Sequence, residues 1–268
     1  MKIIKLSGEE VDTKGIKLLK LTISSPTPRI ETDEVEGIDG QIVLETTFAP
    51  RKIRSAFLME SFDYKDFYLF RNEVFKIFMT KEPFYLIDDE REPSKRWKLQ
   101  AESEFTIEKI SKYGTFEIDF VSHQVYAESV GTTLDPFTFD SELWQFGEGL
   151  LESDDLKYVH NTSSFQIFNA GDITIDPRER PLKITFTGAS NNLSITNNTT
   201  GDVWSYTGAS VNGDIITLDG VRSLKNGTSI FGSTNRKLIT LAPGWNDFTV
   251  TGASGIFTIS FDFRFYYL

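Results

Sequence analysis

The sequence predicts a mainly β protein of two domains: an N-terminal β-sandwich-like domain with one amphipathic helix, and a C-terminal antiparallel β-sandwich. Short apolar runs with alternating polarity recur along the 268 residues, and the composition changes near the middle. Up to Val130 there are 19 Lys+Arg and 24 Asp+Glu, but only 9 and 15 beyond it. Ten of the eleven Asn and 14 of the 19 Gly lie in the second half, which is typical of short strands joined by tight turns. We predict domains at 1–135 and 136–268, connected by Gly131–Phe139.

In the first half, two segments, Gln41–Ala49 and Lys52–Met59, are expected to form strands. Alternate residues of the second segment share one face, which is predicted to be buried: Ile53, Ser55, Phe57 and Met59. Further on, the sequence SKYG at Ser111–Gly114 predicts a hairpin turn in which Gly114 adopts a positive φ.

A single helix of about four turns is predicted between these strands. Its apolar positions follow helical spacing in FDYKDFYLFRNEVFKIFMTKEPF: Phe67, Phe70, Val74, Ile77 and Phe78. Ser61 or Asp63 can cap its start, and Pro83 is expected to end it. No polar catalytic group interrupts this aromatic stripe, so it is interpreted as core rather than as a cofactor site.

The chain ends in FTISFDFRFYYL, from Phe257 to Leu268. Three interpretations are open: a membrane-insertion signal, a docking peptide for a partner, or the last strand of a β-sandwich. Every second residue is apolar and the intervening ones are polar, which favours a half-buried strand. We therefore expect Phe261, Phe263 and Phe265 to lie in the core of the second domain.

Composition excludes several classes of function. The chain has no Cys and only two His, His123 and His160, in different halves, so thiolate catalysis is excluded. No nucleophile elbow, zinc-protease motif, P-loop or dinucleotide fingerprint occurs. We predict a protein that is not an enzyme and that uses no cofactor and no metal. There is no apolar stretch of ~18 residues, so no membrane association is expected. The N-terminus lacks the pattern of a signal peptide, so synthesis in the cytoplasm is expected.

The formal net charge of −11 does not favour binding to nucleic acid or to an anionic membrane. It can simply confer solubility, or it can provide an acidic surface past which polyanions slide. Trp204 and Trp245 are the candidate saccharide contacts, because an indole can stack on a sugar ring. The alternative for each is packing between sheets. A pair of carboxylates for glycan cleavage cannot be placed from sequence among 39 acids.

The ordered motifs of the chain resemble those of siphophage distal tail proteins. Val35–Met59, VEGIDGQIVLETTFAPRKIRSAFLM, is similar to the family's N-terminal V-x-G-x-D-G turn and following strands, with Arg51 or Arg54 at the basic position. The sequence departs from the family pattern at Glu36 and Ile38. An aromatic-rich helix and an E-P-F segment, Glu82–Phe84, follow in the family's order.

The second half carries further motifs of the same family. FNAGDITIDPRERPLKITFTG resembles its asparagine-led entry to the C-terminal sandwich, and LAPGWNDFTVTG resembles its L-x-P-G-x-N turn. That turn places Leu241, Pro243, Gly244 and Asn246 at the matching positions. The aromatic and basic end FRFYYL is also similar. The resemblance extends over nearly the whole chain.

The resemblance implies a structural hub in the virion tail tip, assembled in the host cytoplasm. Its N-terminal domain would form a homo-hexameric ring between the tail tube protein and the tail-associated lysin or baseplate protein. Tape measure and DNA would pass through the channel without specific binding. The C-terminal sandwich, galectin-like in the family, would project outward and carry a receptor-binding protein or contact host saccharide. The alternative function is a carbohydrate-binding module for attachment to the host surface, and the third is a glycan-degrading enzyme.

Overall fold

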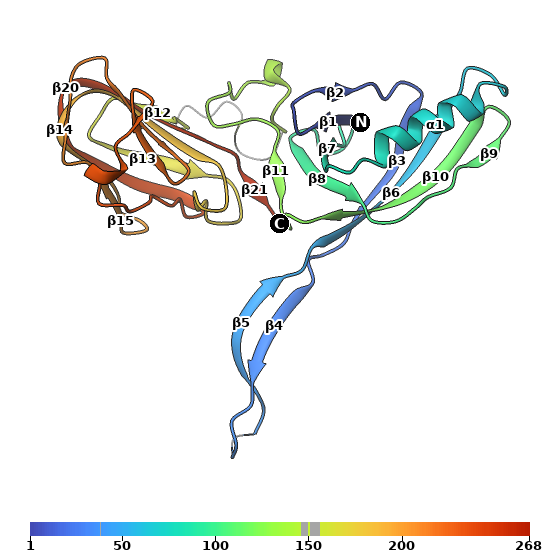
Figure 1. Cartoon of the computed structure of the whole chain (residues 1–268), viewed down its shortest axis with the longest axis horizontal. Coiled ribbons are helices and arrows are strands. Elements are labelled where there is room, and N and C mark those ends of the chain that lie inside the picture. Colours follow the sequence, from blue (N-terminus) through green and yellow to red (C-terminus); the bar gives the residue numbers. More distant parts are fainter. Residues whose placement is uncertain (38, 146–149, 151–155) are drawn as a thin grey trace. The chain divides into compact units, whose positions relative to one another are not determined.

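The computed structural model describes residues 1–37, 39–145, 150 and 156–268, and divides the chain into two compact units. The first unit comprises Met1–Ala127 with Leu268, and the second comprises Glu128–Tyr267. Both are built on antiparallel β-structure, and the helix lies in the first (Figure 1). The predicted fold class, mainly β with a single α-helix and two domains, is therefore confirmed.

The first unit is a curved sheet with the strand order β2-β1-β7-β8-β10-β6-β3, and β9 pairs with β10. A separate two-stranded ribbon, β4-β5, extends away from it (Figure 1). The strands are β1 (Lys2–Lys5), β2 (Glu10–Val11), β3 (Ile16–Ile23), β4 (Pro28–Asp33), β5 (Ile42–Phe48), β6 (Arg51–Glu60), β7 (Phe84–Ile87), β8 (Lys95–Ala101), β9 (Glu108–Ile110) and β10 (Tyr113–Ser122). Strand β11 (Ala127–Ser129) spans the boundary between the units.

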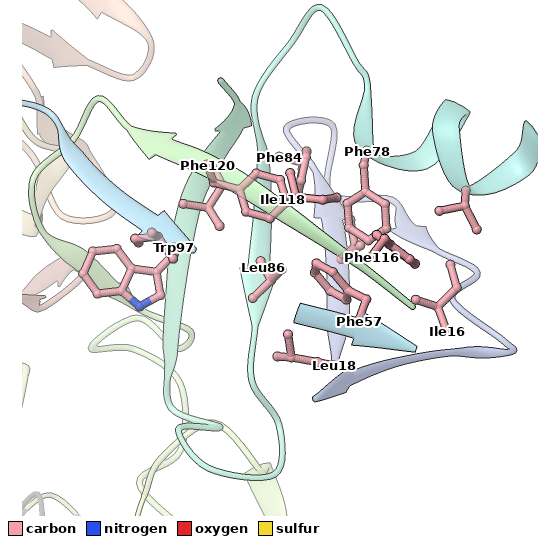
Figure 2. Packing of buried hydrophobic residues seen from close by; sticks show 14 of the residues in the cluster. Ile16, Leu18, Phe57, Phe78, Phe84, Leu86, Trp97, Phe116, Ile118 and Phe120 are labelled. Atoms are coloured by element: carbon pink, nitrogen blue, oxygen red, sulfur yellow. The ribbon is translucent and has the colours of Figure 1, made fainter. Parts of the chain in front are cut away.

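Helix α1 (Phe67–Phe78) packs its apolar stripe on this sheet. Phe57 on β6 lies at the centre of the packing: its ring centroid is 4.8 Å from that of Phe78 and 5.1 Å from that of Phe116 (Figure 2). All three side chains are buried. Truncating a core Phe to Ala costs about 3–5 kcal/mol, so this aromatic cluster is a main source of stability for the unit.

Two local expectations are corrected. The helix has 12 residues and begins at Phe67, with no side-chain cap. Asp63 instead accepts hydrogen bonds from the backbone N–H groups of Lys65 (2.7 Å) and Asp66 (2.8 Å) in the preceding turn. The helix ends at Phe78, before Pro83 is reached.

The turn between β9 and β10 also differs from the prediction. The positive φ belongs to Ser111 (61°) and not to Gly114. Gly114 is required for another reason: a Cβ atom there would lie 2.6 Å from Cγ2 of Ile107. The glycine allows close packing, which the turn pattern alone does not reveal.

The second unit has the strand order β12-β20-β14-β17-β18-β19, with β13 on β20 and both β15 and β16 on β14. Its strands are β12 (Val159–His160), β13 (Ser164–Asn169), β14 (Leu182–Asn197), β15 (Asp202–Ser205), β16 (Ala209–Ser210), β17 (Ile215–Asp219), β18 (Arg222–Lys225), β19 (Thr228–Ser229), β20 (Gly244–Phe263) and β21 (Tyr266–Tyr267). Two short 3₁₀ turns cover Phe139–Ser141 and Phe231–Ser233.

The long strands β14 and β20 each belong to two layers. Strands β14 and β20 pair with each other along two stretches. Along one stretch β17 flanks β14 and β12 flanks β20, and along the other β15 flanks β14 and β13 flanks β20. Between these two stretches the pairing of β14 with β20 shifts register, at Gly188/Ala189 and Ser190/Ser194, and the strands bend there. Gly252 lies at this bend with φ +81°, and a Cβ there would be 2.4 Å from the carbonyl oxygen of Asn192. Only glycine fits so close to another backbone.

The C-terminal aromatic segment is the end of this sandwich. Phe261, Phe263 and Phe265 are at most 2% exposed, so the prediction that they lie in the core is confirmed. Thr133, from the segment expected to connect the domains, accepts a hydrogen bond from the Phe263 N–H (3.1 Å) and donates one to the Phe261 carbonyl (2.7 Å). The segment that follows β11 therefore packs alongside the end of β20, within the second unit.

Three buried asparagines hold the loops at one end of the sandwich. The Asn246 side chain bonds both the N–H (2.9 Å) and the carbonyl (2.8 Å) of Ala242. Asn197 donates to Asn246 (3.1 Å), and Asn169 accepts from the Gly171 N–H (3.0 Å). Asn169 and Asn246 are the asparagines of the two motifs identified in the sequence. Their amides satisfy backbone groups that the strands leave unpaired.

Candidate assembly surfaces

The β4-β5 ribbon is exposed along its whole length. It continues the ladder of β3 and β6 beyond their ends, through hydrogen bonds from the Ser24 N–H to the Lys52 carbonyl (3.3 Å) and from the Ala49 N–H to the Thr27 carbonyl (2.9 Å). The ribbon is thus held to the sheet at its base only (Figure 1).

Near its base, the two faces of the ribbon differ in chemistry. Phe48 opposes Pro28, and two positions further along the same face is Ile30. On the other face Glu31 lies directly opposite Glu45. The apolar side chains of the two strands are between 39% and 63% exposed: Ile30, Ile42, Val43, Leu44 and Phe48. From position 28 to 48 the chain carries six acidic side chains and one basic one, Arg29.

This ribbon lacks the usual sources of β-stability. An isolated two-stranded hairpin is only marginally stable in water. Opposed like charges, such as Glu31 and Glu45, weaken it further. Each of its large apolar side chains would gain about 1.5–3 kcal/mol if a partner covered it completely. The ribbon therefore has the properties of an element that is completed by another surface.

Strand β3 forms one edge of the first unit's sheet. Within the described residues it pairs only with β6, so its outer edge presents backbone groups to another strand. The edge has a bulge between Leu18 and Lys20, and Leu19 there is 43% exposed. The Leu19 carbonyl accepts a hydrogen bond from Arg91 (2.9 Å). The remainder of this edge is a candidate for pairing with another chain.

The structure separates the two arginines that were considered for the basic position. Arg51 is 8% exposed, and its Nε donates to the Ser24 carbonyl (2.6 Å) at the base of the ribbon. Its guanidinium carbon lies 5.0 Å from the ring centroid of Trp97. Arg54 is exposed and pairs with Asp119 on β10 at 2.7 Å. Arg51 is the residue that anchors the ribbon, and Arg54 forms a surface ion pair.

The two candidate saccharide contacts have different environments. Trp204 is 1% exposed, and its indole N–H donates to Ser223 (3.2 Å) within the core. Because the ring is buried, neither of its faces can stack on a sugar. Trp204 instead packs in the core, which is the alternative considered from the sequence. Trp245 is 43% exposed and lies against Phe168, with ring centroids 4.9 Å apart. The saccharide prediction now depends on Trp245 alone.

The two histidines have different environments. His160 stacks on Phe165, with centroids 4.3 Å apart, and burial lowers its pKa. His123 is exposed. Over the described residues, no group of three or more His, Asp or Glu side chains could hold a metal ion. No helix in the described ranges is both long enough and apolar enough to cross a membrane.

The sequence did not reveal the ribbon as an isolated element. It predicted a strand at Gln41–Ala49, which is β5, but not its partner β4. A usable signal was present: the segment combines apolar residues with six acids. Only one cation, Arg29, accompanies these acids, which disfavours packing of the segment on an acidic molecule.

Comparisons with known proteins bear on these surfaces. Residues 10–122 match the family model described as the phage tail protein RIFT-related domain. No curated protein gives a significant match. The chain is similar in structure to the Dit protein of phage SPP1, described as a hub of the adsorption apparatus in phages that infect Gram-positive bacteria. That similarity covers 98% of both chains, with a TM-score of 0.68 and 13% identity.

Chains from two structures of the phage p2 baseplate in its activated conformation, with Ca and with Sr, also match over 98% of this chain and 97% and 96% of theirs. Their identity is 9%, and their TM-scores are 0.45 and 0.44. The matched segment 10–122 contains the ribbon, the β3 edge and α1. Residues 10–122 thus resemble a phage tail protein RIFT-related domain, and the chain as a whole has the fold of the SPP1 Dit protein.

Proposed function

We propose that this protein is the structural hub of a siphophage tail tip and therefore a virion component. In this function it is not an enzyme. Six copies form a ring through the first domain, which we place at residues 1–135. The ring joins the tail tube protein to the tail-associated lysin or baseplate protein, and tape measure and DNA pass through it. The second domain, 136–268, faces outward and carries a receptor-binding protein.

The β4-β5 ribbon is the observation that carries this proposal. Its exposed apolar side chains and the β3 edge form two different surfaces on one subunit, and a ring needs two unlike surfaces that meet head to tail. The ribbon of one copy would be covered by the next copy around the ring. Permanent interfaces of this kind bury on the order of 2,000 Å² or more, which an extended arm helps to provide.

The charge of the chain agrees with a channel for DNA. A lumen lined with carboxylates does not bind phosphates, whereas a cationic one would have to exchange counterions at every step of the DNA. The net charge is −11, and the ribbon with its tip accounts for six acids against one arginine. A ring whose lumen is basic would contradict this part of the proposal.

The test is the mass of the purified protein across concentration, combined with negative-stain images. We expect six-subunit rings with a central hole. Substituting both Ile30→Ser and Phe48→Ser should weaken assembly by about tenfold or more, because two apolar contacts are lost. Ile256→Ser is the matched control, since Ile256 is 91% exposed in the second unit and should leave the ring intact.

Two results would contradict the hub. One is rings of unchanged stability in the ribbon variant. The other is a protein that stays monomeric even when the tail tube protein is supplied as a template.

The second candidate function, a carbohydrate-binding module, is favoured by the exposed indole of Trp245. Saturable glycan binding that Trp245→Ala abolishes without unfolding the protein would support it. Hydrolysis of a cell-wall polysaccharide would instead indicate the glycan-degrading enzyme.

A further inference from the structure

The charged side chains of strand β3 and the turn before it are all positive. Residues 13–23 include Lys14, Lys17 and Lys20 and contain no Asp or Glu. Within the described part of the chain, none of these three ammonium groups takes part in an ion pair. The sheet edge of this acidic protein is therefore locally cationic.

The bulge in β3 brings two of these lysines onto one face. Residues three apart on a regular strand point to opposite faces of a sheet. Because Leu19 is an extra residue, Lys17 lies opposite Leu58 and Lys20 lies opposite Ala56, which are two outward positions of β6. Both lysines are exposed, and two positions along a strand separate them by roughly 7 Å.

Neighbouring groups do not neutralise this pair of lysines. The row that contains Lys20 and Ala56 continues to Glu117 on β10, which forms no ion pair with Lys20 in the described ranges. Arg91 donates to the Leu19 carbonyl at the bulge, but it adds a further cation there and is itself paired with Asp88. The two ammonium groups are thus left facing solvent in a single subunit.

The β4-β5 ribbon carries the opposite charge in a similar arrangement. Glu31 and Glu45 lie directly opposite each other, which places their Cβ atoms about 5 Å apart on one face. Arg29 lies two positions from Glu31, yet it forms no ion pair with either carboxylate among the described residues. Like charges directly opposite each other destabilise a strand pair. A partner surface with two cations at similar spacing would relieve this repulsion.

We propose that Lys17 and Lys20 of one copy face Glu31 and Glu45 of the next copy around the ring. This inference rests on the proposed assembly and assigns the charged contact within it. Like charges oppose the two symmetric alternatives, edge against edge and ribbon against ribbon. The charge pattern therefore favours the head-to-tail contact that a ring requires. Lysines and a bulge on an edge strand also deter pairing with unrelated strands, whereas an acidic ribbon is a partner that they attract.

The experiment reverses the charge of each surface in the full-length protein. The edge-reversed variant combines Lys17→Glu with Lys20→Glu, and the ribbon-reversed variant combines Glu31→Lys with Glu45→Lys. In either variant alone, like charges would meet at every contact of the ring. The concentration needed for half-maximal assembly, measured by mass photometry, should therefore rise by about tenfold or more.

Mixing the two variants in equal amounts should restore the rings. The acidic edge of one variant then meets the basic ribbon of the other, and the unmodified edge and ribbon also meet. Complementary contacts form only between unlike copies, so the rings should contain the two variants in equal numbers, which native mass spectrometry reports. Recovery in the mixture also shows that both variants are folded.

The matched control combines Lys183→Glu with Lys237→Glu. Both positions are exposed in the second unit, and the net charge changes as much as in the edge-reversed variant. This control should assemble like the unmodified protein.

The result distinguishes failure of this contact from failure of the hub. If the unmodified protein forms rings and either variant assembles equally well, the charged contact is wrong and the hub proposal stands. Two impaired variants that do not recover on mixing would also overturn the contact. If the unmodified protein forms no rings even with the tail tube protein present, the hub proposal fails and this inference fails with it.

Discussion

Arg51 and Arg54 illustrate how position within one strand decides the role of a residue. They lie three positions apart on β6, so their side chains point to opposite faces of the sheet. Arg51 is buried, and burial lowers its pKa. Its Nε donates a hydrogen bond to the Ser24 carbonyl, and its guanidinium lies over the Trp97 ring. Arg54 stays in water, where solvent and salt screen its ion pair with Asp119, so the pair contributes little to stability. Replacing Arg51 would therefore disturb the base of the ribbon far more than replacing Arg54.

Asp214 supports a prediction about acid stability. Its carboxylate accepts the Val211 N–H (2.9 Å) and pairs with Lys225 (2.9 Å) and Asn226 (2.7 Å), and these contacts lower its pKa to about 2. Since the folded pKa lies below the ordinary 3.8, the unfolded chain takes up the proton first as pH falls. The stability that these contacts contribute is present above about pH 4 and is lost toward pH 2.

Asp214→Asn should therefore flatten the loss of stability between pH 4 and pH 2. The measurement is the urea midpoint of the second unit at several pH values, for this variant and for the unmodified protein. Asp262→Asn, which changes the net charge equally, should leave the slope closer to that of the unmodified protein. Equal slopes for Asp214→Asn and the unmodified protein would contradict the assignment.

At the scale of elements, the ribbon and the C-terminal strand show contrasting uses of aromatic and aliphatic residues. From Phe257 to its end, β20 alternates apolar and polar residues, and every apolar one is buried. The ribbon strand β5 also carries apolar residues, but each of them is at least 39% exposed. One element contributes to the unit's own core, whereas the other is available to a partner.

Deleting Phe263–Leu268 should leave the second unit molten or insoluble. The deletion removes three buried aromatic side chains, Phe263, Phe265 and Tyr266, and each is worth about 1.5–3 kcal/mol or more of burial. Near-UV circular dichroism and amide NMR dispersion would report the loss. Removing Leu268 alone, which is 54% exposed, is the control and should be tolerated. A well-folded truncated protein that loses only a partner would instead indicate a docking peptide.

At the scale of the whole molecule, the two units differ in the surfaces that they leave uncovered. The ribbon and the β3 edge belong to the first unit, and the exposed Trp245 belongs to the second. This separation suits a hub that uses one domain for assembly and the other for contacts outside the ring.

If assembly belongs to the first domain, a fragment of residues 1–135 should form the same oligomer as the full chain. A fragment of residues 136–268 should remain a monomer at the same concentrations. Mass photometry of both fragments beside the intact protein makes this comparison. A monomeric first fragment, or a second fragment that forms the ring, would contradict the assignment of assembly to residues 1–135.

The sequence by itself determined the fold class, the helix and the buried strand faces, because the periods of 2.0 and 3.6 residues are local properties of the chain. For the same reason it indicated the buried Phe261, Phe263 and Phe265. Only the tertiary structure decided that β5 is exposed, that Trp204 is buried while Trp245 is exposed, and that Arg51 is buried while Arg54 is not. Each of these depends on residues that are distant in sequence. A strand pattern records which side chains share a face, but not what covers that face.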